Sequence, residues 1–497
     1  MIRRFGGVVG AVLVASTVAV AGKIPSHPSK LAFDSLHWEV PRGEPYRVEL
    51  PGGTVAYVAE DRSLPLINVG GYVYTGSVFD PAGKEGLGTL AARMLKSGGT
   101  EKYPADTLDL LLDLFAIDVS FRMKETEMHF GCSFLEEFTD TALDILEQML
   151  FHPAFEEGRL KRERALLAER IIHRFDNPGP VAAAAYEKLM YPRTPVSRLA
   201  VKATLDSIRR EDILAFHAST IRPGNMILAL AGKFDRDSMI AKLRRMLPAG
   251  GDSSRCALAV EAMPKPARKC LFVHKEISQS YVRFGIPIVK RPHPDYYPLT
   301  ILNEILGGGG FTSRLGKKIR SDEGLTYSIY SRAGSSYLYP ATLFVTFHTK
   351  ASSTAKATAL SLEEIRRLRR EGITGDELQR AMDALIEGYP SMFRTPADIT
   401  DNYAWNEYYG RDPDHFEKYP ARIKAITKER VEEVAEKYLD VGGFSFAVVG
   451  DTAQVFPSER YEDFSLRGLT PYALTDEDSL PELFLEPGAK PKSPSAR

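Results

Sequence analysis

The chain has 497 residues, of which 44% are hydrophobic and 26% charged, as in an ordinary soluble globular protein. Its formal net charge of −1 gives no reason to expect nucleic acid or an anionic membrane surface as a partner. This length exceeds one ordinary domain and predicts roughly two to four. Three cysteines are too few for a disulfide scaffold, and we expect them to be small buried apolar residues.

The first residues predict export. Met1-Ile2-Arg3-Arg4 precede an uncharged apolar run over 5–21 that ends in Ala19-Val20-Ala21. A basic start, a short apolar core and a small-residue site are typical of a secretory signal peptide. We expect residues 1–21 to be cleaved, which leaves a periplasmic or secreted protein without membrane contact; a retained membrane anchor is the alternative.

Strands and helices are grouped in the next region of the chain. Residues 46–50 and 54–59 flank Pro51-Gly52-Gly53, which is typical of a hairpin turn, and 67–75 predict a third strand. A helix is expected from about residue 86, followed by antiparallel strands at 115–123 and 127–134 and helices at 137–150 and 157–174. Grouped elements of this kind favour an α+β fold with helices packed on an antiparallel-rich sheet.

The predicted helix at 86–100 carries the most informative motif, Gly-Leu-Gly-Thr-Leu-Ala-Ala-Arg-Met-Leu-Lys-Ser-Gly-Gly-Thr. It resembles the zinc-binding helix of the pitrilysin/insulinase-like metallopeptidases, which has the form G-L-A-H-x-x-E-H-M-L-x-x-G-T. Thr89 and Arg93 stand at the two histidines, and Ala92 stands at the glutamate base. A neutral hydroxyl, a methyl group and a guanidinium supply neither zinc ligands nor a general base. We therefore expect this chain to bind no metal and to hydrolyse no peptide by itself.

The resemblance also implies a third zinc ligand, a glutamate on a later helix. Glu169 lies 76 residues after Arg93, about the spacing in family members, and is a candidate remnant of that ligand. One carboxylate does not hold catalytic zinc, and a solvated helical glutamate is the plain alternative. A further hypothesis is that Arg93 pairs with Glu169 and so replaces the lost metal cross-link.

Self-similarity at a fixed offset divides the chain. Residues 205–213 are echoed by 423–431, and Gly232 and Gly450 close similar apolar strands, all at an offset of 218 residues. This predicts two homologous tandem α/β repeat domains. The expected repeats are 32–247 and 270–455, joined by a linker at 248–269. A partly disordered C-terminal extension is expected at 456–497.

The second repeat carries another stretch that resembles the family. Residues 307–310 are glycines, 313–315 read Ser-Arg-Leu and 320–328 read Arg-Ser-Asp-Glu-Gly-Leu-Thr-Tyr-Ser, with Ser321 as the one clear departure. In family members an arginine and a tyrosine seven residues apart bind the substrate backbone and help to stabilise the oxyanion. The resemblance implies this role for Arg320 and Tyr327, whose guanidinium and phenol suit a carbonyl oxygen that gains charge. A surface charge and a core aromatic are the alternative.

The four glycines, Gly307, Gly308, Gly309 and Gly310, have two interpretations. No G-K-[ST] follows them, and the strand-turn-helix context of G-x-G-x-x-G is missing, so nucleotide binding is not expected. In processing peptidases a glycine-rich segment of the zinc-free subunit contacts substrate, which implies a substrate-binding role. A flexible turn after a helix is the alternative.

Over roughly residues 46–451 the chain resembles the processing-peptidase branch of this family. The resemblance implies a mitochondrial-processing-peptidase-like fold and a non-catalytic, substrate-binding subunit of a two-chain zinc metallopeptidase. A homologous partner would hold the zinc, and peptides or unfolded segments would bind by adding a strand to a sheet edge. A scaffold or peptide-binding protein without a peptidase partner is the alternative, and an autonomous peptidase with unconventional ligands is the third hypothesis. A heterodimer and a homodimer both stay open.

Overall fold

The computed structural model describes residues 27, 30–31, 38–192, 194–248, 254–256, 269–469 and 472–476. The chain divides into two units, Met1–Glu39 and Val40–Arg497, and most of the described residues belong to the second unit. The predicted signal peptide, most of the predicted linker and the polar end of the predicted extension lie outside the described residues. Among the residues that the structure describes, no helix is long and apolar enough to cross a membrane.

The first half of the second unit is built on a mixed sheet whose strand order is β1-β2-β6-β3-β5-β4. Only β2 and β6 pair in parallel, and all other neighbours in this sheet are antiparallel. The strands are β1 (Arg47–Glu49), β2 (Val55–Glu60), β3 (Leu66–Val73), β4 (Asp118–Met123), β5 (Met128–Leu135) and β6 (Met226–Gly232). The hairpin and the alternating strands of the sequence thus lie where their patterns predict, and β4 is left as an edge strand.

Helices cover this sheet and enclose a core of fully buried side chains such as Leu90, Met94 and Phe130. They are α1 (Leu87–Ser97), α2 (Ala105–Leu114), α3 (Thr139–Phe151), α4 (Glu157–Ile172), α6 (Lys202–Asp206), α7 (Arg210–Thr220) and α8 (Arg236–Met246). The N-cap residue of the motif helix α1 is Gly86, whose φ of +100° favours glycine. The buried Asp80 carboxylate accepts hydrogen bonds from the first backbone N–H groups of this helix.

The second half repeats this arrangement, with the strand order β14-β7-β11-β8-β10-β9. Its strands are β7 (Cys270–His274), β8 (Gln279–Pro287), β9 (Ile329–Ala333), β10 (Thr342–Lys350), β11 (Ser445–Gly450) and β14 (Tyr472–Asp476). Its helices are α9 (Tyr296–Asn303), α10 (Thr354–Glu371), α11 (Gly375–Glu387), α13 (His415–Lys424), α14 (Lys428–Tyr438) and α15 (Thr452–Val455), with a small hairpin of β12 (Arg460–Tyr461) and β13 (Phe464–Ser465). The parallel pair β7–β11 corresponds to β2–β6, which confirms the predicted α+β fold of two homologous units.

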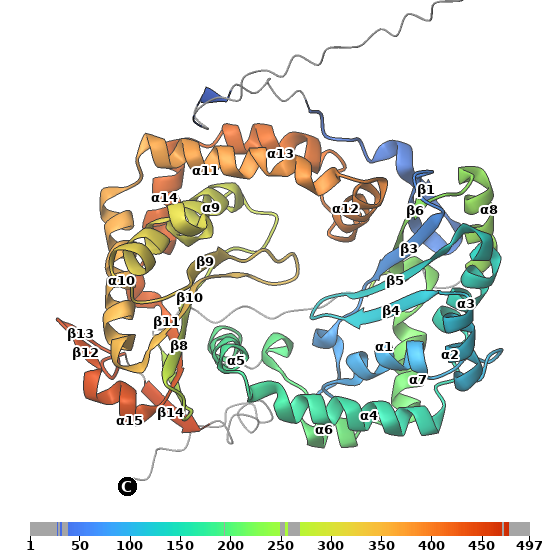
Figure 1. Ribbon diagram of the computed structural model, residues 1–497, viewed down its shortest axis with the longest axis horizontal. Coiled ribbons are helices and arrows are strands. Elements are labelled where there is room, and N and C mark those ends of the chain that lie inside the picture. The colour runs from blue at the N-terminus through green and yellow to red at the C-terminus, as the bar shows by residue number, and fades with distance from the viewer. Residues whose placement is uncertain are drawn as a thin grey trace, which may run out of the picture. The chain divides into compact units, whose positions relative to one another are not determined.

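Two equivalent helices, α5 (Pro178–Met190) and α12 (Pro396–Tyr408), are exchanged between the halves. Both begin with a proline after a capping side chain, from Asn177 and Thr395, at the same 218-residue offset. The helix α5 packs on β7, β8 and β11 of the second sheet, while α12 packs on β2, β3 and β6 of the first (Figure 1). Each half thus buries a face of the other half's sheet.

Hydrogen bonds fix the exchanged helix α12 in place. The Tyr72 hydroxyl on β3 donates to the Asp401 carboxylate at 2.7 Å, and the Tyr57 hydroxyl on β2 donates to Glu407 at 2.9 Å. On the other side, Tyr186 of α5 is buried against the second sheet and is 2% exposed. The two halves therefore share core contacts, a feature that the repeat in the sequence does not reveal.

Candidate functional site

The degenerate motif positions lie on α1, with Ala92 in the core at 2% exposure and with Thr89 and Arg93 half-buried. The Arg93 Nε–H donates to the Glu163 carboxylate of α4 at 2.7 Å, and a second guanidinium nitrogen lies 2.6 Å from the same oxygen. The two side chains are only 21% and 13% exposed. A closed ion pair between α1 and α4 therefore stands at the family's second histidine position.

The hypothesis that Arg93 pairs with Glu169 is wrong. Glu169 has a 68% exposed side chain, and its carboxylate lies 3.0 Å from the His173 ring. Glu163 and Glu169 are six residues apart on α4. At about 100° per residue they point about 120° apart around the helix axis, so only one of them faces α1.

The residues at this position do not fit a zinc ion. A guanidinium carries a fixed positive charge, and the nearest carboxylate, from Glu163, is already taken up by it. Within the described ranges, His, Cys, Asp and Glu side chains form no group of three that could hold a metal ion.

The second predicted pair, Arg320 and Tyr327, does come together in space. Arg320 lies on the π-helical segment η11 (Gly316–Asp322), and its guanidinium carbon is 4.8 Å from the centroid of the Tyr327 ring. The same carbon lies 3.9 Å from the ring centroid of Phe311. Tyr327 is 80% exposed and Phe311 is 63% exposed, so the cluster faces solvent.

The donors of this cluster are unengaged. In the part of the chain that the structure describes, neither the Arg320 guanidinium nor the Tyr327 hydroxyl forms a hydrogen bond or an ion pair. A guanidinium stacked between two rings keeps the N–H groups at its edge for another acceptor. Phe311 was not predicted from the sequence, although an aromatic residue directly after four glycines is a usable signal.

The Ser313-Arg314-Leu315 stretch anchors the segment that carries Arg320. The Arg314 guanidinium donates to both Glu377 oxygens of α11, at 2.8 and 2.9 Å, and to the Gly372 carbonyl at 2.8 Å. Such a two-pronged contact fixes direction as well as distance. Arg314 therefore holds the start of η11 against α11 and helps to position the cluster of Phe311, Arg320 and Tyr327.

The four glycines form the connection between α9 and Phe311. They run from η9 (Glu304–Gly308), a π-helical segment, into η10 (Gly310–Thr312). A Cβ on Gly307 would meet the Ser331 backbone nitrogen of β9 at 2.5 Å, so this contact requires glycine. The glycines thus make a tight turn beside β9, and a direct contact with substrate stays a prediction.

An open sheet edge lies next to the cluster. Tyr327 lies two residues before the start of β9, which is the edge strand of the second sheet. A cavity of about 400 Å³ lies beside it, lined by Ser328 and Tyr330 and by Arg283 of β8. Burial lowers the pKa of Arg283, whose Nε has no hydrogen-bond partner among the described residues.

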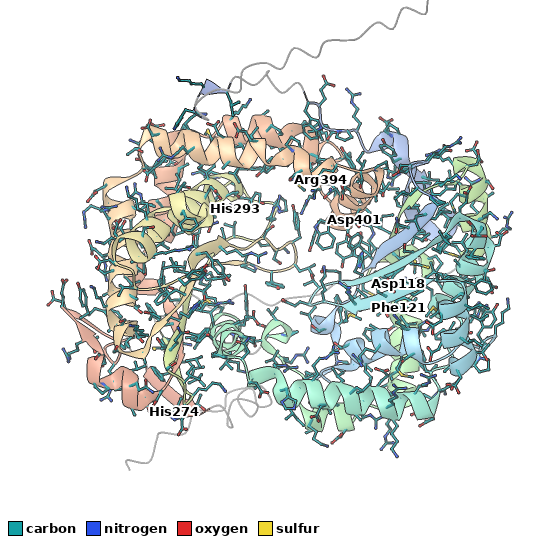
Figure 2. The ribbon with its side chains drawn as sticks, viewed as in Figure 1. Asp118, Phe121, His274, His293, Arg394 and Asp401 are labelled. Carbon is teal, nitrogen blue, oxygen red and sulfur yellow. The ribbon has the colours of Figure 1, made fainter. Side chains whose placement is uncertain are left out.

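The first sheet offers a comparable space over its inner face. A cavity of about 390 Å³ there is lined by Asp118 of β4, His129 of β5 and Asp401 of α12. Figure 2 labels Asp118 and Asp401. Like β9, the strand β4 is a sheet edge with unpaired backbone groups on one side. Both edge strands are suited to adding an extended peptide.

Two family profiles match the chain in succession. Residues 57–201 match the profile described as Insulinase (Peptidase family M16). Residues 207–385 match the profile described as Peptidase M16 inactive domain. The first range contains the altered motif on α1, and the second contains Arg320 and Tyr327.

Curated relatives and solved structures agree with these matches. The Non-peptidase homolog YmxG of Helicobacter pylori is 25% identical over 374 residues, which cover 74% of this chain and 84% of the relative. The Uncharacterized zinc protease YmxG of Bacillus subtilis is 25% identical over 341 residues, or 68% of this chain and 82% of the relative. A peptidase M16 inactive domain from Pseudomonas fluorescens has a TM-score of 0.73 at 22% identity, covering 82% of this chain and 97% of that one. A protease from Helicobacter pylori has a TM-score of 0.69 at 17% identity, covering 81% of this chain and 98% of that one.

Proposed function

The chain belongs to the M16 insulinase family of peptidases, and from this premise we propose that it is the zinc-free, substrate-binding subunit of a two-chain peptidase. It is an M16-like protein whose motif helix has lost both histidines and the glutamate base. The missing zinc would come from a homologous partner with an intact motif. Arg320 and Tyr327 would complete that partner's active site.

The contrast between Arg93 and Arg320 is the main support for this proposal. Arg93, at the lost zinc site, is neutralised by Glu163 and closed off between two helices. Arg320 is stacked on two exposed rings, and none of its donors is used by a described residue. Exposed aromatic side chains grouped around an unpaired cation are typical of a binding site rather than of a folded core.

The local geometry suits an extended peptide. A substrate strand paired with the free edge of β9 would run next to Tyr327, and the cavity beside Ser328 and Tyr330 would receive its side chains. The Arg320 guanidinium and the Tyr327 hydroxyl would then donate to a substrate carbonyl oxygen. Donors placed where charge develops in the transition state are worth about 10²–10³ in rate each.

The test uses the chain co-expressed and purified with its zinc-bearing sister chain. We expect Arg320→Ala and Tyr327→Phe each to lower kcat/KM for peptide cleavage by about 10²-fold, in line with the loss of one oxyanion donor. The zinc content and the yield of the complex should stay the same. Arg366→Ala, which removes a half-exposed arginine of α10, serves as the matched control. Equal activity of the unmodified complex, the two site variants and the control variant would refute the composite site.

A second candidate is a peptide-binding protein that works without a peptidase. The name of its Helicobacter pylori relative, Non-peptidase homolog, supports this candidate. It predicts that the chain alone binds an extended peptide as tightly as any complex does. The composite enzyme instead predicts that turnover appears only with the sister chain.

A further inference from the structure

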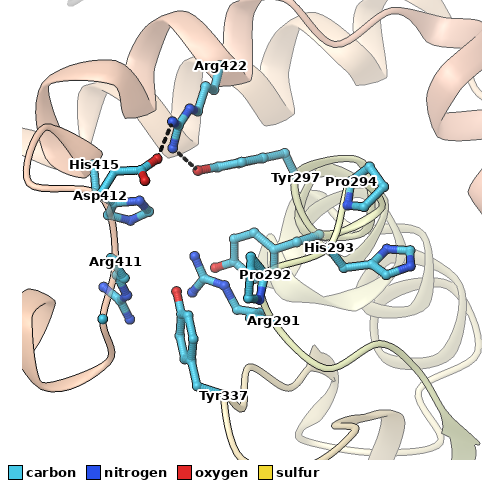
Figure 3. Close-up of a pocket in the computed structure, with 12 residues that line it drawn as sticks. Arg291, Pro292, His293, Pro294, Tyr297, Tyr337, Arg411, Asp412, His415 and Arg422 are labelled. Atoms are coloured by element: carbon cyan, nitrogen blue, oxygen red, sulfur yellow. Dashed lines mark hydrogen bonds and ion pairs between the residues drawn. The ribbon is translucent and has the colours of Figure 1, made fainter.

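A second cluster of cations lines a cavity of about 360 Å³ in the second half. Its walls come from the β8–α9 connection, the β9–β10 connection and the residues around the start of α13 (Figure 3). Three arginines line it, Arg291, Arg411 and Arg422, together with the tyrosines Tyr296, Tyr297 and Tyr337. A cavity of this volume lies in the range of small-ligand sites.

Arg291 is a buried charge without a counterion. It is 7% exposed, and its guanidinium carbon lies 3.6 Å from the Tyr296 ring centroid and 4.7 Å from that of Tyr337. Its only side-chain hydrogen bond within the described ranges goes to the Ser335 hydroxyl at 3.0 Å, and no described carboxylate pairs with it. A buried cation normally requires an anionic partner.

Arg411 approaches Tyr337 from the side opposite to Arg291 (Figure 3). Its guanidinium carbon lies 5.1 Å from the Tyr337 ring centroid. Its Nε is buried and has no hydrogen-bond partner, and it forms no ion pair with any residue that the structure describes. Arg291 thus contacts the rings of Tyr296 and Tyr337, and Arg411 contacts those of Tyr337 and Tyr409, at 5.2 Å from the latter. These ring contacts hold both guanidinium groups in place but supply neither of them with an anionic partner.

The remaining polar groups leave the cavity positive. Arg422 donates to the Tyr297 hydroxyl at 3.0 Å and to Asp412 at 3.1 Å. Asp412 is the one carboxylate among the described lining residues. Burial and the neighbouring arginines lower the pKa of His415 to about 3, so its ring is neutral at neutral pH. Three guanidinium groups thus face one carboxylate.

We infer that this cavity binds an oxyanion, a carboxylate or a phosphate, held between Arg291 and Arg411. Its two oxygens would accept from the unpaired guanidinium N–H groups, and the tyrosine rings would cover the adjoining atoms of the ligand. Arginine suits such anions because its donors match paired oxygens. This inference does not depend on the proposed peptidase partnership, because the site is formed by this chain alone.

The test measures anion binding by the full-length protein at constant ionic strength, by calorimetry and thermal unfolding. The probes are inorganic phosphate, an acetylated tripeptide with a free C-terminal carboxylate, and the same tripeptide as an amide, each against chloride. We expect a saturable rise in Tm with phosphate, with the free carboxylate or with both, and none with the amide. A response to phosphate alone identifies a phosphate ligand, and a response to the carboxylate identifies a peptide end or acid. No saturable effect of either anion would overturn the inference.

Two variants assign the effect to the cavity. Arg411→Gln, at the half-buried arginine, should weaken binding at least about 10-fold, the loss expected for one charged hydrogen-bond partner. Arg366→Gln makes the same charge change on the exposed side of α10 and should bind as the unmodified chain does. We chose Arg411 rather than Arg291 because replacing the more deeply buried Arg291 can prevent folding. Unchanged affinity in folded Arg411→Gln would contradict the assignment.

Discussion

Arg93 and Glu163 form the contact that now joins α1 to α4 at the altered motif. Both side chains are largely buried, so each depends on the other for its charge partner. Glu169, the sequence-based candidate, lies in solvent beside His173 instead. The sequence could not separate these two glutamates, because the choice depends on which side of α4 faces α1.

The first prediction concerns this pair. Arg93→Ala should lower the free energy of unfolding by about 1–3 kcal/mol, because it leaves the Glu163 carboxylate buried without a partner. Glu169→Ala should change it by less than about 0.5 kcal/mol, as expected for an exposed position. Urea denaturation of the two variants measures both values. Equal destabilisation would mean that the ion pair does not connect the helices.

At the scale of elements, the strands followed from their apolar pattern, and the motif helix followed from its resemblance to the zinc-binding helix of the family. Residues 118–123 and 128–135 form strands because apolar side chains alternate along them, and the N-cap of α1 is a glycine that the backbone requires. The π-helical turns η9 and η11 were not predicted, since their residues have no distinctive period. They nevertheless place Phe311 and Arg320 together, with Arg314 as their anchor.

The second prediction concerns that anchor. Burial alone would raise the pKa of Glu377, but hydrogen bonds from Arg314 and the Thr374 backbone lower it to about 2. A carboxyl whose folded pKa lies below its unfolded value of about 4.3 stabilises the protein above that value. This contribution should be lost as the pH falls from about 4.3 to about 2. Denaturation of Glu377→Gln across this range should show a flatter pH dependence, and an unchanged slope would argue against the anchor.

At the scale of the whole described unit, the exchange of α5 and α12 joins the halves. The repeat in the sequence predicts two similar units, but it carries no information about which sheet each helix covers. The same limit applies to the oxyanion cavity, because Arg291 and Arg411 are 120 residues apart in the sequence. Long-range packing of this kind becomes visible only in the fold.

The third prediction follows from the exchange. Because each half covers the other's sheet, the two should unfold together, in one cooperative transition. Differential scanning calorimetry should give a calorimetric enthalpy equal to the van't Hoff enthalpy. Two separated transitions would show that the halves are independent domains.

The fourth prediction concerns Glu187 of α5. Burial and the nearby Glu125 raise its pKa to about 7. The folded state therefore holds this proton more tightly than the unfolded state, so stability should fall as the pH rises through about 7. Glu187→Gln should remove part of this fall in urea midpoints measured from pH 5.5 to 8.5. Glu387→Gln, at an exposed position on α11, should leave the profile unchanged.

The most direct test of the composite active site is a reconstitution titration. The zinc-bearing sister chain, purified alone, is mixed with increasing amounts of this chain, and the cleavage of an unstructured peptide is measured. We expect little activity from either chain alone and a rise in cleavage rate that saturates at equal amounts of the two. A sister chain that is equally active without this chain would contradict the central claim.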